Sequence, residues 1–317
     1  MRAALLEDEN AFDRIFNWTE NNLLRDDGMY SWRWHPGDES RPGWIVDENT
    51  ATDADQDIAL ALIIAARAFD RPELLSRAAQ IITAIRTGTG IKVGDSWFLS
   101  AGNWANDQRI MNISYFMPYS YPLFHELDPS GNWLEVRSTG YEILSALLRM
   151  SPSNLFPDFN FIDKNGHVSP IIDLDGLDSD FSFDAMRIYW RVALDCILSP
   201  HLRACSDSAR ISTIHDIIAE HGQVFSRYDI FTGEPLNDLV SLSFYGSFLP
   251  GMRLHHPVLA ESILNSELSM ERISPILNDP DRYYDLNWIW FGLAADNGLI
   301  KDMTPDPQWV RQAVVHN

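Results

Sequence analysis

Cysteine is nearly absent from this sequence of 317 residues. The two cysteines, Cys196 and Cys205, lack metal-type spacing and are too few for a disulfide framework, so they do not indicate a cellular compartment. No run of eighteen apolar residues occurs, and the opening MRAALLEDENAF matches neither a signal peptide nor a membrane anchor. We therefore expect no metal site, no cofactor and no membrane insertion.

Basic residues are also scarce, with 24 Lys and Arg against 45 Asp and Glu and a net charge of −21. A field of this sign repels phosphate backbones and anionic membrane surfaces, which argues against nucleic acid and membranes as partners. A neutral ligand fits this charge better. Hydrophobic residues make up 45% of the chain, which is enough for a large core.

Tryptophan is abundant by contrast, with 11 residues, and several lie in stretches rich in polar residues, Gly or Pro, such as YSWRW (30–34) and AGNW (101–104). Most tryptophans fill protein cores. Exposed indole rings can also stack on flat ligands such as sugar rings. The flanking sequence alone leaves both interpretations open.

Helical periodicity dominates the chain, and convincing strand alternation is scarce. The stretch IALALIIAARAF (58–69) is apolar on almost every face, which predicts a helix buried within a second layer of helices. Short strands are expected at 90–99 and in 160–172. We predict one all-α domain with long loops, and helices at 10–24, 52–69, 72–86, 119–126, 133–149, 183–199, 207–224, 256–265 and 284–295.

Three acids precede the buried helix in TATDADQDIAL (50–60). Asp53, Asp55 and Asp57 match the start of a calcium loop, but Ile58 and Ile64 stand where that loop needs Gly and Glu. A capped helix start explains them better, with Thr50 or Thr52 as the cap and acids at the positive end of the helix dipole. Three acids exceed what a cap requires, which favours an acid-lined site.

The stretch 51–69, ATDADQDIALALIIAARAF, resembles the signature of glycoside hydrolase family 8 at every fixed position. Other segments resemble that family in the same order: FDRIFNWTENNL (12–23), DGMYSWRW (27–34), NISYFMP (112–118), PDFNFIDKNG (157–166), SFDAMRIYWRVALD (182–195) and RYYDLNWIWFGLA (282–294). Two positions depart from the pattern, Ile113 for Pro and Phe159 for Trp. The resemblance implies an (α/α)6 barrel and one catalytic domain over 1–317.

The resemblance also implies a function. Members of the family hydrolyse β-1,4-linked glycans, chiefly cellulose and related glucans, and some act on xylan or chitosan. They invert the anomeric centre, which requires a carboxylic acid for the leaving oxygen and a carboxylate that activates water. We therefore expect a β-glucan substrate, a monomer and, as in most of the family, a secreted or periplasmic enzyme.

Residue by residue, the resemblance makes Asp53 the acid that positions the sugar at the cleavage point, with Asp55 as its support and Asp57 chiefly a cap. Asp184 matches the general base, although an N-terminal cap of the following helix explains it equally well from local sequence. Arg187 is expected to hold a carboxylate or a sugar oxygen. Sugar-stacking aromatic rings are expected at Trp32, Trp104, Tyr115, Tyr283 and Tyr284.

One element of the family pattern is missing. The general acid of the family is a Glu in an SEG..Y segment, about seventeen to eighteen residues before the Phe that corresponds to Phe12, a spacing taken from the resemblance. Only eleven residues precede Phe12 here, and Glu7 and Glu9 read as solvated turn acids. The resemblance thus predicts a shortened first helix. Either the chain is a shortened enzyme, or it is a non-catalytic glycan-binding or regulatory protein associated with cellulose synthesis; a hydrolase of xylan or chitosan is a further alternative.

Overall fold

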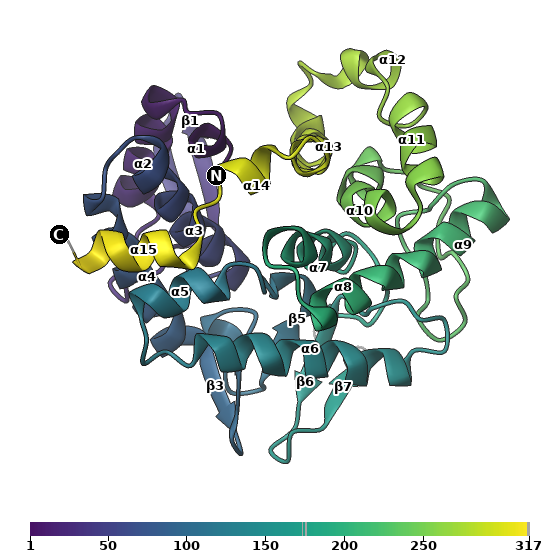
Figure 1. Cartoon of the computed structure of the whole chain (residues 1–317), viewed down its shortest axis with the longest axis horizontal. Helices are drawn as coiled ribbons and strands as arrows, with labels where there is room; N and C mark the ends of the chain where they lie inside the picture. The colour runs from purple at the N-terminus through teal and green to yellow at the C-terminus, as the bar shows by residue number, and fades with distance from the viewer. Residues whose placement is uncertain (173, 175, 316–317) are drawn as a thin grey trace.

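The computed structural model describes residues 1–315 except 173 and 175. Its helices are arranged in a ring that runs from the N-terminal α1 through α5 and α7 to α13 (Figure 1). The helices are α1 (Arg2–Leu5), α2 (Glu9–Asn22), α3 (Thr52–Ala68), α4 (Glu73–Thr89), α5 (Tyr121–Leu127), α6 (Trp133–Met150), α7 (Arg187–Leu198), α8 (Leu202–Ser208), α9 (Ser212–His221), α10 (Leu242–His255), α11 (Pro257–Asn265), α12 (Met270–Ile273), α13 (Tyr283–Asp296), α14 (Leu299–Met303) and α15 (Pro307–Val315). Short 3-10 turns include η1 (Asn103–Ala105), η2 (Ile113–Tyr115) and η3 (Ala209–Ile211).

Burial separates inner from outer helices. In α3 every residue from Ala59 to Ala66 is buried, as its apolar sequence predicted, whereas α2 buries only Phe12. The central residues of α7 and α10 are buried on all sides in the same way. Because a helix that is apolar all round must be covered by neighbours, α3, α7 and α10 form the inner layer.

Two glycines bring helices α10 and α13 together. A Cβ atom at Gly246 would collide with the backbone of Trp288, and one at Gly292 would collide with the backbone of Gly246. Only glycine allows the two backbones to approach this closely. Substitution at either position would therefore separate the two helices.

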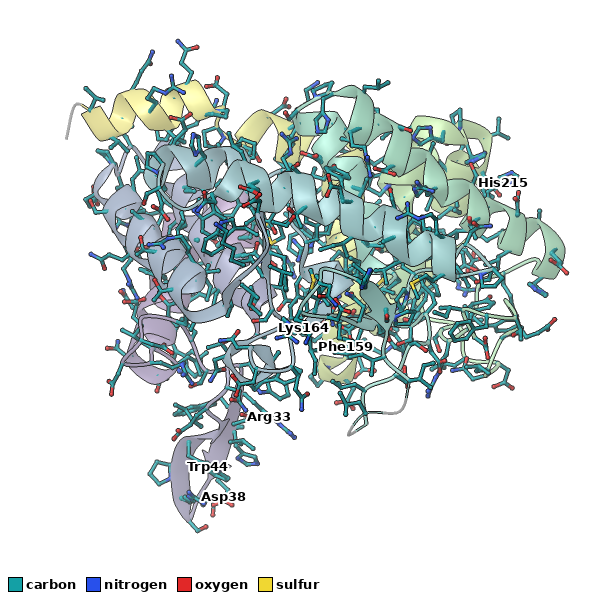
Figure 2. The ribbon with its side chains drawn as sticks, turned by 90° about the horizontal axis from the view of Figure 1, so that it is seen from below. Arg33, Asp38, Trp44, Phe159, Lys164 and His215 are labelled. Carbon is teal, nitrogen blue, oxygen red and sulfur yellow. A yellow bond between two sulfur atoms is a disulfide. The ribbon has the colours of Figure 1, made fainter. Side chains whose placement is uncertain are left out.

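In the part of the chain that the structure describes, three small antiparallel sheets lie beside the ring of helices. They are β1 (Arg33–Asp38) with β2 (Arg41–Asp47), β3 (Gly90–Val93) with β4 (Ser96–Leu99), and the order β5 (Ile110–Asn112), β6 (Phe159–Ile162), β7 (Val168–Pro170). In register, Met111 pairs with Asn160, and Asn160 pairs with Pro170. The β1–β2 hairpin extends beyond the body at the lower edge of Figure 2, whereas α15 lies along the upper edge.

Most predicted helices are present, but two predicted ranges had wrong bounds, and the elements missed from the sequence include α10 and the β1–β2 hairpin. The helix expected over 207–224 is not continuous, because residues 207–208 end α8, η3 follows, and α9 ends at His221; the stretch 183–186 precedes α7 instead of belonging to it. Helix α10 was missed because Pro250 and Gly246 read as helix breakers. The β1–β2 hairpin was missed because Pro36 and Pro42 lie in its strands, and Pro is depleted in strands. The strands expected at 90–99 and 160–172 are present as β3–β4 and β6–β7.

Several bulk expectations can be compared with the described part of the chain. Cys196 and Cys205 form a disulfide that joins α7 to α8. Among the described residues, no helix has the length and apolarity needed to cross a membrane. The same residues contain no group of three His, Cys, Asp or Glu side chains arranged to hold a metal ion.

Candidate active site

A single guanidinium group joins two of the predicted acids. Arg187, the first residue of α7, donates from Nη1 to Asp53 Oδ2 at 2.9 Å, and its Nη2 pairs with Asp184 Oδ1. The Arg187 Nε also donates to the carbonyl of Asp184 at 3.3 Å. Since Asp53 lies in the first turn of α3, the ion pairs bring the N-terminal ends of two inner helices together.

Burial dominates the electrostatics of Asp53. Loss of solvent raises the pKa of the Asp53 carboxyl, and the Arg187 guanidinium opposes that rise. The carboxylate of Asp184 is more open, with 31% of its side chain exposed. One acid is thus enclosed by protein while the other keeps access to water, which suits different tasks for the two groups.

Tyr115 covers the same guanidinium. The Arg187 Cζ lies 5.5 Å from the centre of the Tyr115 ring, and the carbonyl of Tyr115 accepts a hydrogen bond from Gln56 at 2.9 Å. Burial, followed by the charge of Asp53, raises the pKa of the Tyr115 hydroxyl well above its usual value. The phenol is therefore a neutral hydrogen-bonding group beside the acids.

Asp55 and Asp57 differ from each other in this structure. Asp55 is 1% exposed and accepts a hydrogen bond from the backbone N–H of Tyr30 at 2.9 Å, and burial raises the pKa of its carboxyl well above the usual range. Asp57 was predicted to be a cap, and this was wrong, because its carboxylate bonds Arg191 at 3.2 and 3.3 Å. The sequence could not show this pairing because Arg191 is 134 residues away.

The threonine cap predicted for α3 was also wrong. Ala51 is the N-cap residue and makes no side-chain cap bond. The hydroxyl of Thr52 donates to the carbonyl of Ser100 at 2.8 Å, and that of Thr50 accepts from the N–H of Asn103 at 3.2 Å. Both hydroxyls are used to attach the loop before α3 to the segment 100–103.

This attachment places two of the predicted tryptophans next to the start of α3. The backbone N–H of Trp32 donates to the carbonyl of Asn49 at 3.0 Å. The indole of Trp104 lies against Gly102, and the carbonyl of Thr50 is close to the same glycine. The residues are 50% and 42% exposed respectively. Two open indole rings therefore flank the loop that leads to Asp53.

The two tyrosines predicted on α13 have different surroundings. Tyr284 donates from its hydroxyl to the carbonyl of Phe183 at 2.8 Å, and its ring packs on that of Phe183. The charges of Arg187 and Asp184 act on the pKa of Tyr284, which burial raises. Tyr283 is 71% exposed, and none of the contacts among described residues joins it to this group. The structure thus brings Tyr284 to the acids and leaves Tyr283 at the surface.

One acid of this group was missed from the sequence. Asp158 is buried, and its carboxyl accepts hydrogen bonds from the N–H of Ser182 at 3.0 Å and of Ala185 at 2.6 Å. These two residues flank Asp184 in the chain. The sequence signal is the position of Asp158 in PDFNFIDKNG, a segment that resembles the PDW pattern of family 8 at Pro157 and Asp158 but does not indicate a role for this acid.

Comparison with known proteins places this geometry in a family. The model of the glycosyl hydrolases family 8 matches residues 1–233. The chain belongs to this family. The family 8 chain is 29% identical over 212 residues to an endoglucanase of Xanthomonas axonopodis pv. citri (strain 306), a match covering 61% of this chain and 50% of that protein.

Further similarities agree with this family. A probable endoglucanase of Novacetimonas hansenii is 30% identical over 196 residues, covering 59% of this chain and 56% of the relative. The chain thus spans about half the length of the curated relatives it matches. The crystal structure of an endo-1,4-D-glucanase from Vibrio fischeri ES114 superposes with a TM-score of 0.78 at 22% identity, covering 97% of this chain and 88% of that one. This likeness confirms the predicted (α/α)6 barrel.

The general acid expected from the family has no counterpart next to Arg187. Among residues 1–315 without 173 and 175, no hydrogen bond or ion pair joins a glutamate to Asp53, Asp184 or Arg187. Glu9, expected to be a solvated turn acid, is exposed and lies 3.5 Å from Arg71 on the outer surface. The described acids near Arg187 are aspartates.

A cavity of about 430 Å³ lies elsewhere, at the C-terminal ends of α3 and α7. Its lining includes Arg67 and Leu198 from these ends and Trp309 from α15, at the upper edge of Figure 2. The hairpin that follows Trp32 lies at the opposite edge. We therefore place the candidate active site at the N-terminal ends of the inner helices, where side chains with the required chemistry meet.

Proposed function

We propose that this chain is a glycosidase of the endo-β-1,4-glucanase type that inverts the anomeric centre. The observation that carries the proposal is the group of Asp53, Asp184 and Arg187, because it holds one enclosed acid and one water-accessible carboxylate across a single guanidinium. Membership of family 8 supports a glycan as the substrate class. The open indole rings of Trp32 and Trp104 suit the apolar faces of sugar rings.

In the proposed reaction, Asp184 accepts a proton from a water molecule while the water oxygen bonds to the anomeric carbon. The bond from that carbon to the leaving oxygen breaks on the opposite face, and the leaving oxygen takes a proton from a solvent water molecule. Asp53 accepts hydrogen bonds from hydroxyls of the sugar at the cleavage point. Arg187 keeps both carboxylates oriented and stabilises their negative charge.

The leaving oxygen has no general acid among the described residues near Arg187, and we propose that hydrolysis of unactivated glycans is impaired in this chain. Loss of a general acid lowers a rate by about 10²–10⁴-fold. Fluoride leaves without needing a proton, so β-cellobiosyl fluoride tests the base separately from the acid. We expect hydrolysis of this fluoride and slow hydrolysis of carboxymethylcellulose.

The decisive experiment compares three proteins on both substrates: the native chain, Asp184→Asn, and a chain carrying the family's SEG..Y turn in front of Met1. We expect Asp184→Asn to abolish fluoride hydrolysis, and the added turn to restore hydrolysis of carboxymethylcellulose. Proton NMR of the first product identifies the anomer and hence the stereochemistry. The proposal fails if none of these proteins hydrolyses either substrate.

A second candidate is a glycan-binding or regulatory protein associated with cellulose synthesis. It is favoured by the lack of a glutamate bonded to the Asp53–Arg187–Asp184 group among the described residues. This candidate predicts that cello-oligosaccharides bind in isothermal titration calorimetry while β-cellobiosyl fluoride stays intact. Turnover of the fluoride that depends on Asp184 would exclude it.

We also propose an exported, secreted or periplasmic location, and a monomer acting on a β-glucan chain. The disulfide between Cys196 and Cys205 supports export, because disulfides persist in oxidising compartments. Fractionation of the source cells, together with a thiol count on the purified protein, tests the location.

A further inference from the structure

Asp158 connects three segments of the candidate site. It precedes β6, its N–H donates to the carbonyl of Asp180 at 2.9 Å, and its carbonyl accepts from the N–H of Ile113 at 3.4 Å. Ile113 begins η2, the turn that carries Tyr115. The side chain of Asp158, 5% exposed, reaches the segment before α7. A single residue thus ties the turn of Tyr115 to the turn that presents Asp184.

The turn that presents Asp184 depends on this carboxyl group for its backbone hydrogen bonds. Asp158 Oδ1 accepts from the N–H groups of Ser182 and Ala185, and Oδ2 bonds the hydroxyl of Ser182. Helix α7 begins only at Arg187 and has no side-chain cap of its own. Buried N–H groups left without acceptors destabilise a fold, so Asp158 supplies what a cap residue supplies elsewhere.

The surroundings of Asp158 favour the neutral acid. Burial, followed by the charge of Asp184, raises the pKa of Asp158 to about 7. Its charge also acts on Tyr284 and Arg227, and Arg227 forms an ion pair with Asp180 at 2.6 Å. In the neutral form Oδ1 accepts both N–H groups and Oδ2–H donates to Ser182. No second negative charge then competes with Asp184.

We propose that Asp158 is a positioning residue for the reaction, which fixes the 182–185 turn so that the Asp184 carboxylate stays against Arg187 and open to water. The inference rests on the proposed role of Asp184 as the base. It concerns a buried group that does not touch the substrate. Asparagine reproduces the same pattern, with one acceptor oxygen and one donor, whereas alanine removes it.

The test measures kcat and KM on β-cellobiosyl fluoride for Asp158→Asn and Asp158→Ala. We expect the asparagine variant to keep kcat within about threefold of native, and the alanine variant to lose at least about tenfold in kcat with KM nearly unchanged. Asp128→Asn is the matched control, since Asp128 is also a buried carboxylate bonded by three side chains, from Arg86, Ser130 and Trp133. We expect that control to keep its kcat.

The pH profile adds a signature that a purely structural role would not produce. As pH rises through about 7, Asp158 ionises and its Oδ2 keeps accepting from the hydroxyl of Ser182, but a second negative charge is added beside Asp184, so native kcat should fall. Asp158→Asn lacks this ionisation, and its kcat should stay level over the same range. The inference is overturned if the asparagine variant loses as much activity as the alanine variant. It is also overturned if both variants show the same pH profile of kcat as the native chain.

Failure of the inference and failure of the proposed function give different results. If Asp184→Asn leaves fluoride hydrolysis unchanged, the proposed base is wrong and the inference falls with it. If Asp184→Asn abolishes hydrolysis while Asp158→Ala is as active as the native chain, only the inference is wrong. Crystal structures of both Asp158 variants show directly whether the 182–185 turn moves, with movement expected for alanine alone.

Discussion

Removal of the Arg187 guanidinium tests the electrostatic account of the site most directly. Its side chain is 12% exposed and bonds two carboxylates, of which Asp53 is the more enclosed. Removing one partner of a buried ion pair costs about 3–5 kcal/mol. Because water reaches Asp184 and relieves part of that cost, we expect Arg187→Met to lower the free energy of unfolding by about 3 kcal/mol at pH 8.

The loss should depend on pH in a defined direction. The pKa of Asp53 is already raised by burial, and Arg187 limits that rise, so the variant raises this pKa further. A raised pKa means that the folded state binds the proton more tightly than the unfolded state, so stability falls as pH increases from the unfolded pKa to the folded pKa. We therefore expect a smaller loss at pH 5 than at pH 8.

Urea denaturation followed by tryptophan fluorescence measures both values. The control is Arg311→Met, because Arg311 bonds Glu126 through two contacts of 2.7 Å but its side chain is 69% exposed. Exposed ion pairs contribute about 0–1 kcal/mol. A loss in Arg187→Met no larger than in this control at pH 8, or equal losses at pH 5 and pH 8, would refute the reasoning.

Three further predictions concern the surroundings of the site. The raised pKa of buried Asp55 makes the stability of the native chain fall as pH rises. In calorimetry, the melting temperature of Asp55→Asn should therefore decrease less between pH 5 and pH 8 than that of the native chain. Reduction of Cys196–Cys205 should lower the free energy of unfolding by about 2–3 kcal/mol, and a thiol assay on the unreduced protein should find no free thiol. Trp32→Ala should weaken cello-oligosaccharide binding in titration calorimetry by roughly tenfold, about 1.4 kcal/mol, while Trp309→Ala, on α15 at the opposite edge, should leave it unchanged.

The inner helices could be predicted from sequence because burial on all sides leaves a visible pattern. The run from Ala59 to Ala66 is apolar at every position, and the structure buries all of it. By contrast, α10 is equally buried but contains Pro250 and Gly246, so local propensity argued against a helix. Packing against α13, made close by glycine, outweighs that propensity.

Among the acids of the site, those whose position depends on nearby residues could be predicted, and those whose partners are distant in the chain could not. The position of Asp53 at the start of α3 followed from its local sequence, and the resemblance to family 8 indicated Asp184 and Arg187. The partner of Asp57 could not be predicted, because Arg191 is brought to it only by the packing of α7 on the rest of the ring. Asp158 was missed for the same reason, since its bonds reach 24 and 27 residues along the chain.

Arg187 itself breaks a local rule, and this violation argues for function. A cation at the first position of a helix opposes the positive end of the helix dipole, at a cost of about 0.3–1 kcal/mol, and acids are favoured there instead. Helix α7 has no acid in its first turn and carries Arg187 at that position. Two carboxylates offset the cost, yet one of them, Asp53, is itself destabilised by burial. Local stability favours neither Arg187 at the start of α7 nor a buried carboxylate at Asp53. Such conflicts are expected where a fold holds reactive groups in place.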